Sequence, residues 1–187
     1  MPFVQLLRHG AHSDVGSRLT GRAPDGGLTA QGRAQAIAAA GKMTRSPPTA
    51  IFASPRRRTM ETAELVAERF DLSVTSSTAL DEIDFGDWTG AKFVDLAADK
   101  RWTEWNAHRA TARCPSGESQ TEAQARSLAF AFEAAATTER PLLVTHCDII
   151  RALLCWAERR SLDDIHSVSC EPGSLFTLDL VQAKVAA

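Results

Sequence analysis

The sequence predicts an α/β protein of three layers, in which helices cover both faces of a mainly parallel, mixed central sheet. Short apolar runs that resemble strands alternate along the 187 residues with longer segments that resemble helices. The hydrophobic content of 44% and the charged content of 24% are those of an ordinary globular domain. The chain contains neither an internal repeat nor a low-complexity linker. We therefore expect a single domain over residues 1–187.

Four apolar runs predict the main strands of the sheet. The last run alternates apolar and polar residues over much of its length, which is typical of a strand with one buried face. Short segments at residues 72–75 and 78–83 are also expected to be extended, around a turn. The four main strands are expected at residues 3–7, 49–53, 142–146 and 174–180.

The helices are placed by their start signals. Thr29 is a suitable N-cap after a loop over residues 11–28 that is rich in Gly, Ser, Asp and Pro. Ser54 as N-cap, with Pro55 at the first helical position, predicts the next helix. Asp148 is expected to cap the helix that follows the third strand. The expected helices run from Thr29 to before Pro47, from Ser54 to about Phe70, and over residues 92–110, 118–138 and 149–159.

Net charge and cysteine spacing restrict the function classes. A formal net charge of −2 gives no general attraction for nucleic acid or for an acidic membrane. Four cysteines lie far apart without a CxxC pair, a pattern that fits neither a structural zinc site nor a small disulfide scaffold. The sequence shows no signal peptide and no apolar run of about 20 residues. We expect a cytoplasmic protein with reduced thiols.

Two of the predicted strands end on a histidine, which is the most informative feature of the chain. Arg8-His9-Gly10 closes the first strand and His146 closes the third. The carboxyl ends of parallel strands meet at the edge of the sheet where ligands bind. A neutral imidazole near pH 7 can attack phosphorus. Histidines and arginine at this edge therefore predict a site for an anion, and we expect a phosphate.

Arg56, Arg57 and Arg58 stand at the start of a predicted helix that follows a strand. Guanidinium groups match phosphate oxygens, and a helix start adds free N–H groups. Adjacent helical residues point about 100° apart, so one of the three is expected to face the pocket. The helical period alone does not show which of the three arginines faces the pocket.

The segment 80–88 could supply the acid that a leaving alkoxide needs. It carries several carboxylates among apolar residues, where desolvation could keep one of them protonated. Asp84 and Asp87 are expected to form turns, and Phe85 and Trp88 to belong to the core or to a pocket wall.

Five ordered motifs resemble those of the histidine phosphatase superfamily, the phosphoglycerate mutase-like group. The resemblance extends from residue 3 to about residue 180, and the stretch from Thr20-Gly21 to Leu28-Thr29-x-x-Gly32 resembles the first loop and helix start of that family. The five motifs are Arg8-His9-Gly10, Ser54-Pro55-x-x-Arg58-x-x-x-Thr62-Ala63, Leu80-x-Glu82-x-x-Phe85-Gly86-x-Trp88-x-Gly90, Pro115-Ser116-Gly117-Glu118-Ser119 and Val144-Thr145-His146.

The resemblance implies a role for each matching residue. His9 is similar to the nucleophile that becomes phosphohistidine, and Glu82 to the proton donor. Arg8, Arg58 and His146 resemble the rest of the phosphate pocket. The resemblance implies a phosphoglycerate mutase-like fold, no cofactor and no metal. On the same basis, the substrate-binding residues are expected to be Arg8, Arg58, His146, Thr20, Gly21 and His12.

The chain departs from the family pattern after the first motif. Ala11, His12 and Val15 stand near places where an acidic residue, Thr and Asn are frequent. His12 either replaces the lost hydrogen-bond donor or fills space. Ser116 replaces a frequent glycine, which a loop should tolerate. These departures bear on substrate preference rather than on the core chemistry.

Hydrolysis is favoured over phosphoglycerate mutase chemistry because the stretch between Glu82 and His146 is short for a glycolytic mutase. Two other hypotheses are a non-catalytic phosphate-binding protein and a metal site built from His9, His12 and His146, which Arg8 would oppose. We expect a small phosphorylated substrate, no nucleic-acid partner, and a monomer or homodimer.

Residues 91–117 are expected to cover the substrate and to set its identity. Six cationic or aromatic side chains of this segment are expected to cover the site and suggest an anionic or ring-bearing substrate, although an exposed helix with inward-facing tryptophans explains the pattern equally well. These side chains are Arg101, Trp102, Trp105, His108, Arg109 and Arg113.

Overall fold

The predicted mixed sheet is present, with four strands running parallel and one antiparallel. The computed structural model describes residues 2–180. The strand order is β3-β2-β4-β1-β5, and β5 pairs antiparallel with β1 while the other neighbours are parallel. The strands are β1 Phe3–Arg8, β2 Ala50–Ala53, β3 Val74–Ser76, β4 Pro141–Thr145 and β5 Leu175–Asp179.

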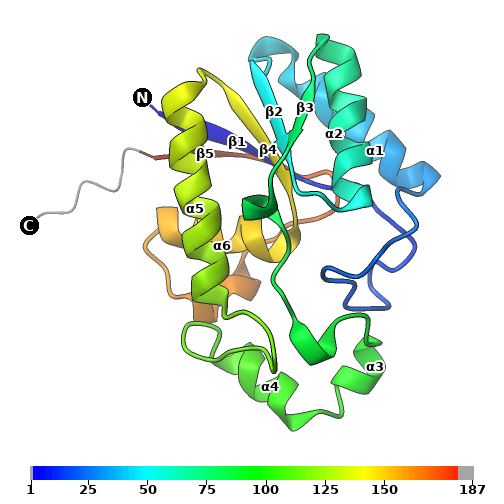
Figure 1. Ribbon diagram of the computed structural model, residues 1–187, viewed down its shortest axis with the longest axis vertical. Coiled ribbons are helices and arrows are strands. Elements are labelled where there is room, and N and C mark those ends of the chain that lie inside the picture. The colour runs from blue at the N-terminus through cyan, green and yellow to red at the C-terminus, as the bar shows by residue number, and fades with distance from the viewer. Residues whose placement is uncertain (1, 181–187) are drawn as a thin grey trace, which may run out of the picture.

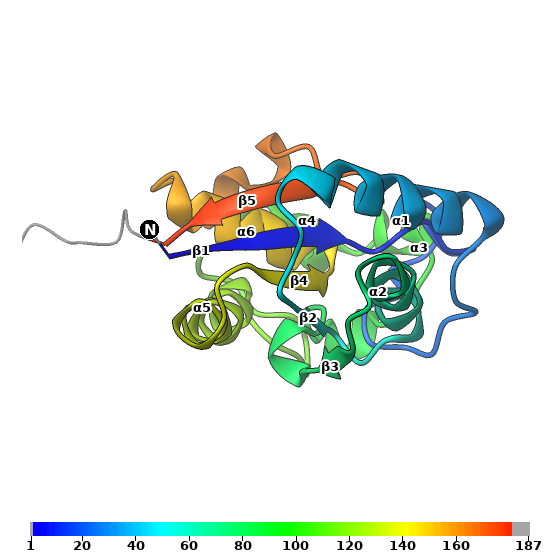
Figure 2. The ribbon, with the colours of Figure 1, turned by 90° about the horizontal axis from the view of Figure 1, so that it is seen from above.

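Helices cover both faces of the sheet, which confirms the three-layer architecture (Figures 1 and 2). Alternate residues of one strand serve opposite faces: Val4 and Leu6 pack in the core with α5 and α6, whereas Leu7 packs with α1 and α2. The short helices α3 and α4 lie together beyond one end of the sheet (Figure 1). The helices are α1 Ala30–Lys42, α2 Arg57–Phe70, α3 Phe93–Leu96, α4 Lys100–Ala107, α5 Gln120–Thr137 and α6 Cys147–Ala157.

The strand register brings the ends of three strands together. Arg8 of β1 pairs with Thr145 of β4, so His9 and His146 follow at neighbouring positions. Ala53 of β2 pairs with Val144, which puts Ser54 beside the same strand end. The sheet therefore gathers two histidines and a serine at one edge before any loop contributes.

Thr29 caps α1 as predicted, because its side chain accepts a hydrogen bond from the Gly32 amide. The prediction for Ser54 was wrong. Helix α2 begins at Arg57 with Arg56 at the N-cap position, and no side chain caps it. The Ser54 hydroxyl instead contacts His146 and Asp81 inside the protein, so a long-range hydrogen bond replaced the local cap.

Three other local predictions were also wrong. The single helix expected over residues 92–110 is divided into α3 and α4, because the Asp99 carboxylate accepts the Arg101 amide and starts a new helix. His146, and not Asp148, occupies the N-cap position of α6. A 3₁₀ turn over Thr78–Leu80 replaces the extended piece expected there. Three further 3₁₀ turns span Met43–Arg45, Gly86–Trp88 and Leu162–Ser167.

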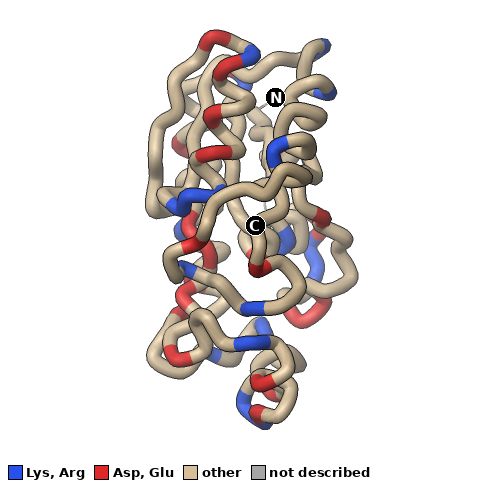
Figure 3. Tube along the Cα trace, turned by 90° about the vertical axis from the view of Figure 1, so that its right-hand side faces the viewer, with Lys and Arg blue, Asp and Glu red and all other residues tan. Residues whose placement is uncertain are grey.

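Charges of both signs are interspersed along the chain (Figure 3). This distribution agrees with the formal net charge of −2. Within residues 2–180, no helix combines the length and the apolar character that crossing a bilayer would need.

Gly10 allows the end of β1 to lie directly against the start of α1. A Cβ atom at Gly10 would lie 2.3 Å from the carbonyl oxygen of Gly32, which is backbone and cannot move aside cheaply. We predict that Gly10→Ala lowers the free energy of unfolding by about 1–3 kcal/mol, the usual cost of overpacking. Urea unfolding measures the change.

The control is Gly41→Ala near the end of α1, where a Cβ would meet nothing within 4 Å. Alanine favours helix over glycine by up to about 1 kcal/mol, so this variant should be as stable as the wild type or more so. Equal stability of the Gly10→Ala protein and the wild type would contradict the close approach.

Candidate active site

His9 is buried at the end of β1 with both ring nitrogens engaged. Its Nδ1 lies 2.8 Å from the carbonyl oxygen of Gly10, and Arg58 Nε lies 3.3 Å from its Nε2. An arginine N–H can only donate, so Nε2 accepts and Nδ1 carries the proton that it donates to Gly10. Burial, then the charges of Arg58 and Arg8, lower the pKa of His9 well below its usual value. The ring is therefore neutral, with its lone pair on Nε2.

His146 is fully buried beside His9, and the two ring centroids are 5.3 Å apart. Arg58 Nη2 lies 2.9 Å from His146 Nδ1, and Ser54 Oγ lies 2.8 Å from its Nε2. Burial, followed by the charge of Arg58, lowers the pKa of His146 well below its usual value. This ring is also neutral, and the same donor argument places its proton on Nε2.

Arg58 joins the two histidines. Its side chain is 2% exposed, and α2 holds it within the first helical turn. Besides the two imidazoles, it donates to the Gly21 carbonyl at 2.7 Å and forms an ion pair with Asp25 at 2.7 Å. Asp25 is also almost fully buried, so the first loop supplies the counter-charge that a buried guanidinium needs.

The other two arginines of the triplet face elsewhere. Arg57 is 64% exposed and pairs with Glu61. Arg56 pairs with Asp81 at 2.8 Å. Arg58 thus takes the inward position that helical spacing allowed for one of the three.

Arg8 and His12 border His9 from the side of β1 and the first loop. Arg8 is half-buried and donates from Nη1 to the Cys170 carbonyl, while its buried Nε lacks a partner among residues 2–180. The His12 ring lies 5.3 Å from that of His9, and its buried Nδ1 likewise lacks a partner in the described part of the chain. Burial, then Arg58, lowers the pKa of His12.

Glu82 is 8% exposed and stands where the chain leaves the 3₁₀ turn. Its Oε1 accepts the Ile83 amide at 3.0 Å. Burial, together with the charge of Asp148, raises the pKa of Glu82 to about 8. The carboxyl group is therefore protonated at neutral pH and can donate a proton.

Asp148 stays ionised despite its own burial, because Arg109 contacts it at 3.0 Å and lowers its pKa, with help from Arg151. Arg109 is 2% exposed and stacks 3.5 Å above the ring of Trp105. The two neighbouring carboxyl groups thus hold opposite protonation states, an arrangement that enzymes use to separate an acid from a base.

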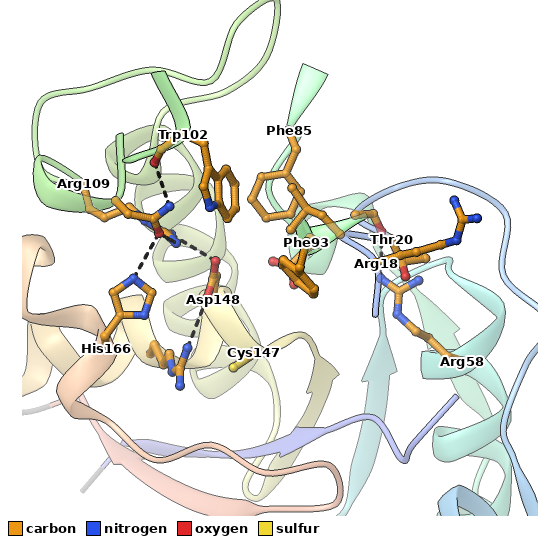
Figure 4. Close-up of a pocket in the computed structure, with 15 residues that line it drawn as sticks. Arg18, Thr20, Arg58, Phe85, Phe93, Trp102, Arg109, Cys147, Asp148 and His166 are labelled. Carbon is orange, nitrogen blue, oxygen red and sulfur yellow. Dashed lines mark hydrogen bonds and ion pairs between the residues drawn. The ribbon is translucent and has the colours of Figure 1, made fainter. Parts of the chain in front are cut away.

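A cavity of about 230 Å³ connects Arg58 and Glu82 to the α3–α4 segment. In Figure 4, Arg58, Arg18 and Thr20 lie on one side, Arg109, Asp148 and His166 on the other, and Phe85, Phe93 and Trp102 between them. Gly21 and Cys147 also line it. The remaining lining residues are Leu19, Glu82, Asn106 and Arg151.

The six side chains expected to cover the site divide into two groups. Trp102 and Arg109 line the cavity, and Trp105 is buried beneath them. The other three border a separate hollow of about 410 Å³, which Trp105 also lines, and the two arginines among them pair with Asp99 and Glu122. These three are Arg101, His108 and Arg113.

Several polar residues of the site escaped the sequence reasoning. Asp148 and Arg151 could have been noticed from their i, i+3 spacing on the helix after His146. Asp25, Arg18 and His166 carry no local signal, because loops far apart in the sequence bring them to the site. Within residues 2–180, no cluster of three or more His, Cys, Asp and Glu side chains is placed to hold a metal ion.

Comparison with known proteins decides the family. The model of the histidine phosphatase superfamily (branch 1) matches residues 4–186. The chain belongs to the histidine phosphatase superfamily. It is 35% identical over 167 residues to a glucosyl-3-phosphoglycerate phosphatase of Mycobacterium tuberculosis, covering 79% of this chain and 71% of that one.

Two further likenesses support the assignment. The solved structure of the mycobacterial glucosyl-3-phosphoglycerate phosphatase with VO3 superposes with a TM-score of 0.83 at 29% identity, over 95% of this chain and 92% of that one. A probable phosphoglycerate mutase GpmB of Salmonella paratyphi C is 31% identical over 169 residues, covering 84% of this chain and 78% of the relative. The protein is a phosphatase of this superfamily with a phosphoglycerate mutase-like fold.

The paired carboxyl groups yield a prediction that does not depend on turnover. The Glu82 carboxyl should titrate near pH 8 in a carbon-13 NMR experiment, with the signal assigned by its loss in Glu82→Gln. Asp148→Asn removes a negative charge that favours the protonated form, so the pKa of Glu82 should fall.

Asp71→Asn is the matched control, because Asp71 caps α2 in the left-handed conformation that asparagine tolerates. It should leave the titration of Glu82 unchanged. A Glu82 signal that titrates near 4.5 in the wild type would contradict the raised pKa.

Proposed function

We propose that the protein is a metal-independent phosphomonoesterase that works through a phosphohistidine at His9. The observation that carries the proposal is the contact of one buried guanidinium, Arg58, with both His9 Nε2 and His146 Nδ1. A phosphoryl group between the two rings would accept hydrogen bonds from Arg58. Arg8, whose buried Nε faces no partner among residues 2–180, would add positive charge.

Chemistry follows in two steps in this proposal. His9 Nε2 attacks phosphorus, the bond from phosphorus to the ester oxygen breaks, and Glu82 gives its proton to the leaving alkoxide. Glu82, now a carboxylate, then takes a proton from a water molecule that attacks phosphorus. The phosphorus–nitrogen bond breaks, phosphate leaves, and both Glu82 and His9 return to their initial states.

The cavity supports a small phosphate ester as the substrate. Phe93 and Trp102 offer apolar walls of the kind that ligand pockets use, while Arg18 and Arg151 offer donors to hydroxyl or carboxylate groups. The relative from Mycobacterium tuberculosis is a glucosyl-3-phosphoglycerate phosphatase, and a mycobacterial enzyme of that name has been solved with inorganic phosphate. We therefore propose a phosphorylated sugar or sugar acid as the substrate class, with Thr20 and Gly21 beside it and residues 91–117 as its cover.

His12 is proposed as a further phosphate ligand, since its ring lies beside His9 and its buried Nδ1 lacks a partner among the described residues. The alternative, that His12 only fills space, predicts that His12→Ala leaves KM unchanged.

Mutase chemistry is a second candidate because of the likeness to the probable phosphoglycerate mutase. It would transfer the phosphoryl group from His9 to a sugar acid instead of water. A bisphosphorylated sugar acid would then activate the protein, and the phosphoenzyme would be stable enough to isolate. Rapid loss of the phosphoryl group to water would favour the phosphatase.

His9 should be essential and should carry the phosphoryl group. We predict that the wild type, treated with a chelator, releases phosphate from members of a panel of sugar phosphates. With a substrate labelled in the phosphoryl group, alkaline quenching should leave label on His9. His9→Ala should lose both the label and the activity, since removal of an attacking nucleophile leaves little residual rate.

The control is Asp71→Asn, which changes an exposed residue at the end of α2 outside the cavity and should retain full activity. The function fails if the metal-free wild type releases phosphate from no ester of the panel. A non-catalytic phosphate-binding protein would bind these esters tightly without releasing phosphate.

The loss of activity on replacing Glu82 should increase with the basicity of the leaving group. We predict that Glu82→Gln lowers kcat/KM for alkyl phosphates by about 10²- to 10⁴-fold, the usual contribution of general acid catalysis. The ratio kcat/KM reports transfer of the phosphoryl group to His9 and not the later attack of water, in which Glu82 acts as the base. p-Nitrophenyl phosphate should lose far less, because nitrophenolate leaves without a proton. The two ratios of kcat/KM measure the effect, and equal losses of kcat/KM on both substrates would show that Glu82 is not the acid.

The wild-type rate should fall as pH rises through about 8, since the reactive form of Glu82 is the protonated one. This alkaline limb should appear in kcat/KM for alkyl phosphates and should be absent for p-nitrophenyl phosphate, whose leaving group needs no proton. A wild-type rate that stays level through pH 9 would argue against a protonated Glu82 in the reaction.

A further inference from the structure

Behind His146, away from Arg58, lies a buried polar pair that the catalytic steps do not use. Ser54 is fully buried and its Oγ lies 2.8 Å from His146 Nε2. The same Oγ lies 3.1 Å from Asp81 Oδ1, and Asp81 is 4% exposed. Neither Ser54 nor Asp81 lines the cavity that holds Arg58 and Glu82.

The hydrogen bonds through these residues can run in one direction only. Arg58 Nη2 must donate, so His146 Nδ1 accepts and the neutral ring carries its proton on Nε2. That N–H donates to Ser54 Oγ, which leaves the hydroxyl proton of Ser54 to donate to Asp81. The order is therefore Arg58, His146, Ser54, Asp81, ending on a carboxylate.

Ion pairs and hydrogen bonds hold Ser54 and Asp81, the last two residues of this series of hydrogen bonds, in place. Asp81 Oδ2 pairs with Arg56 at 2.8 Å, and Asp81 Oδ1 accepts the Glu82 amide at 3.0 Å. Arg22 lies 3.8 Å from Asp81. The Ser54 amide is bound to the carbonyl of Val144 in β4 at 3.0 Å. Ser54 and Asp81 thus have fixed positions from which they can orient a ring.

We propose that Ser54 and Asp81 are positioning residues that act through His146, holding its ring with Nδ1 turned toward Arg58 and the phosphoryl group. This inference rests on the proposed function, in which His146 borders the reacting phosphoryl group. Held in this way, the neutral ring keeps the Nδ1 lone pair on Arg58 and so fixes the guanidinium that would bind the phosphoryl oxygens.

A double-mutant cycle tests whether Ser54 acts through His146. Ser54→Ala should lower kcat for p-nitrophenyl phosphate by about 10- to 100-fold, the range found for residues that orient metal-bound histidines. In a His146→Ala background the same substitution should cost nothing more, because the group that it orients is gone. Asp81→Asn, which removes the charge and keeps the shape, should also lower kcat.

Ser127→Ala is the matched control. Ser127 is likewise fully buried, but its hydroxyl bonds to backbone carbonyls within α5. This variant should keep the wild-type kcat. Additive losses in the Ser54→Ala/His146→Ala protein would overturn the proposal, since a merely structural role predicts additivity. Thermal unfolding of each variant separates a lost fold from a lost orientation.

Nitrogen-15 NMR of the histidines shows the direction of these hydrogen bonds and does not require turnover. The wild type should show His146 protonated on Nε2, with a hydrogen-bonded imide proton that shifts or exchanges rapidly in Ser54→Ala. A wild-type His146 protonated on Nδ1 would overturn the proposal. If the wild type hydrolyses esters while Ser54→Ala matches it in kcat and in spectrum, this inference fails and the proposed function stands.

Discussion

The structure depends on one buried cation that is shared by two imidazoles. Arg58 donates to His9 and to His146, and these bonds set the tautomer of both rings. An unpaired buried guanidinium would be costly by several kcal/mol, so Asp25 must accompany it. That requirement explains why the first loop lies across the edge of the sheet, where it also brings Gly21 to Arg58.

Two neighbouring carboxyl groups of the pocket, Asp148 and Glu82, hold opposite protonation states. Arg109 and Arg151 keep Asp148 ionised, and the ionised Asp148 helps to keep Glu82 protonated. The charged residues that help to keep Glu82, the acid of the proposed reaction, protonated therefore come from α6 and from the segment before α5. They are not its neighbours in sequence. Arg58 and Glu82 line one cavity, and residues of α3 and α4 form its opposite wall.

The sequence predicted the edge of the sheet well, because a polar residue directly after a buried strand must lie at the end of that strand. His9 and His146 were found in that way, and the strand register then put them side by side. Ser54 was misread as a helix cap because its true partners, His146 and Asp81, are 92 and 27 residues away in the chain. Long-range partners of this kind leave no local pattern.

Spacing also could not choose Arg58 from its two neighbours, since α2 starts at Arg57 instead of beside Ser54 and the helical phase is set by that start. The family resemblance made the choice. It was silent on Asp25 and Asp148, whose importance comes from burial and from the charges around them. Such residues become visible when the loops are placed in three dimensions.

The ring nitrogen that carries the phosphoryl group tests this account most directly. Because Gly10 binds His9 Nδ1 while Arg58 faces Nε2, attack must occur through Nε2. Proton–phosphorus correlation NMR of phosphoenzyme quenched in alkali distinguishes the two isomers of phosphohistidine. The account predicts phosphorylation of His9 on Nε2, and a phosphoryl group on Nδ1 would contradict it.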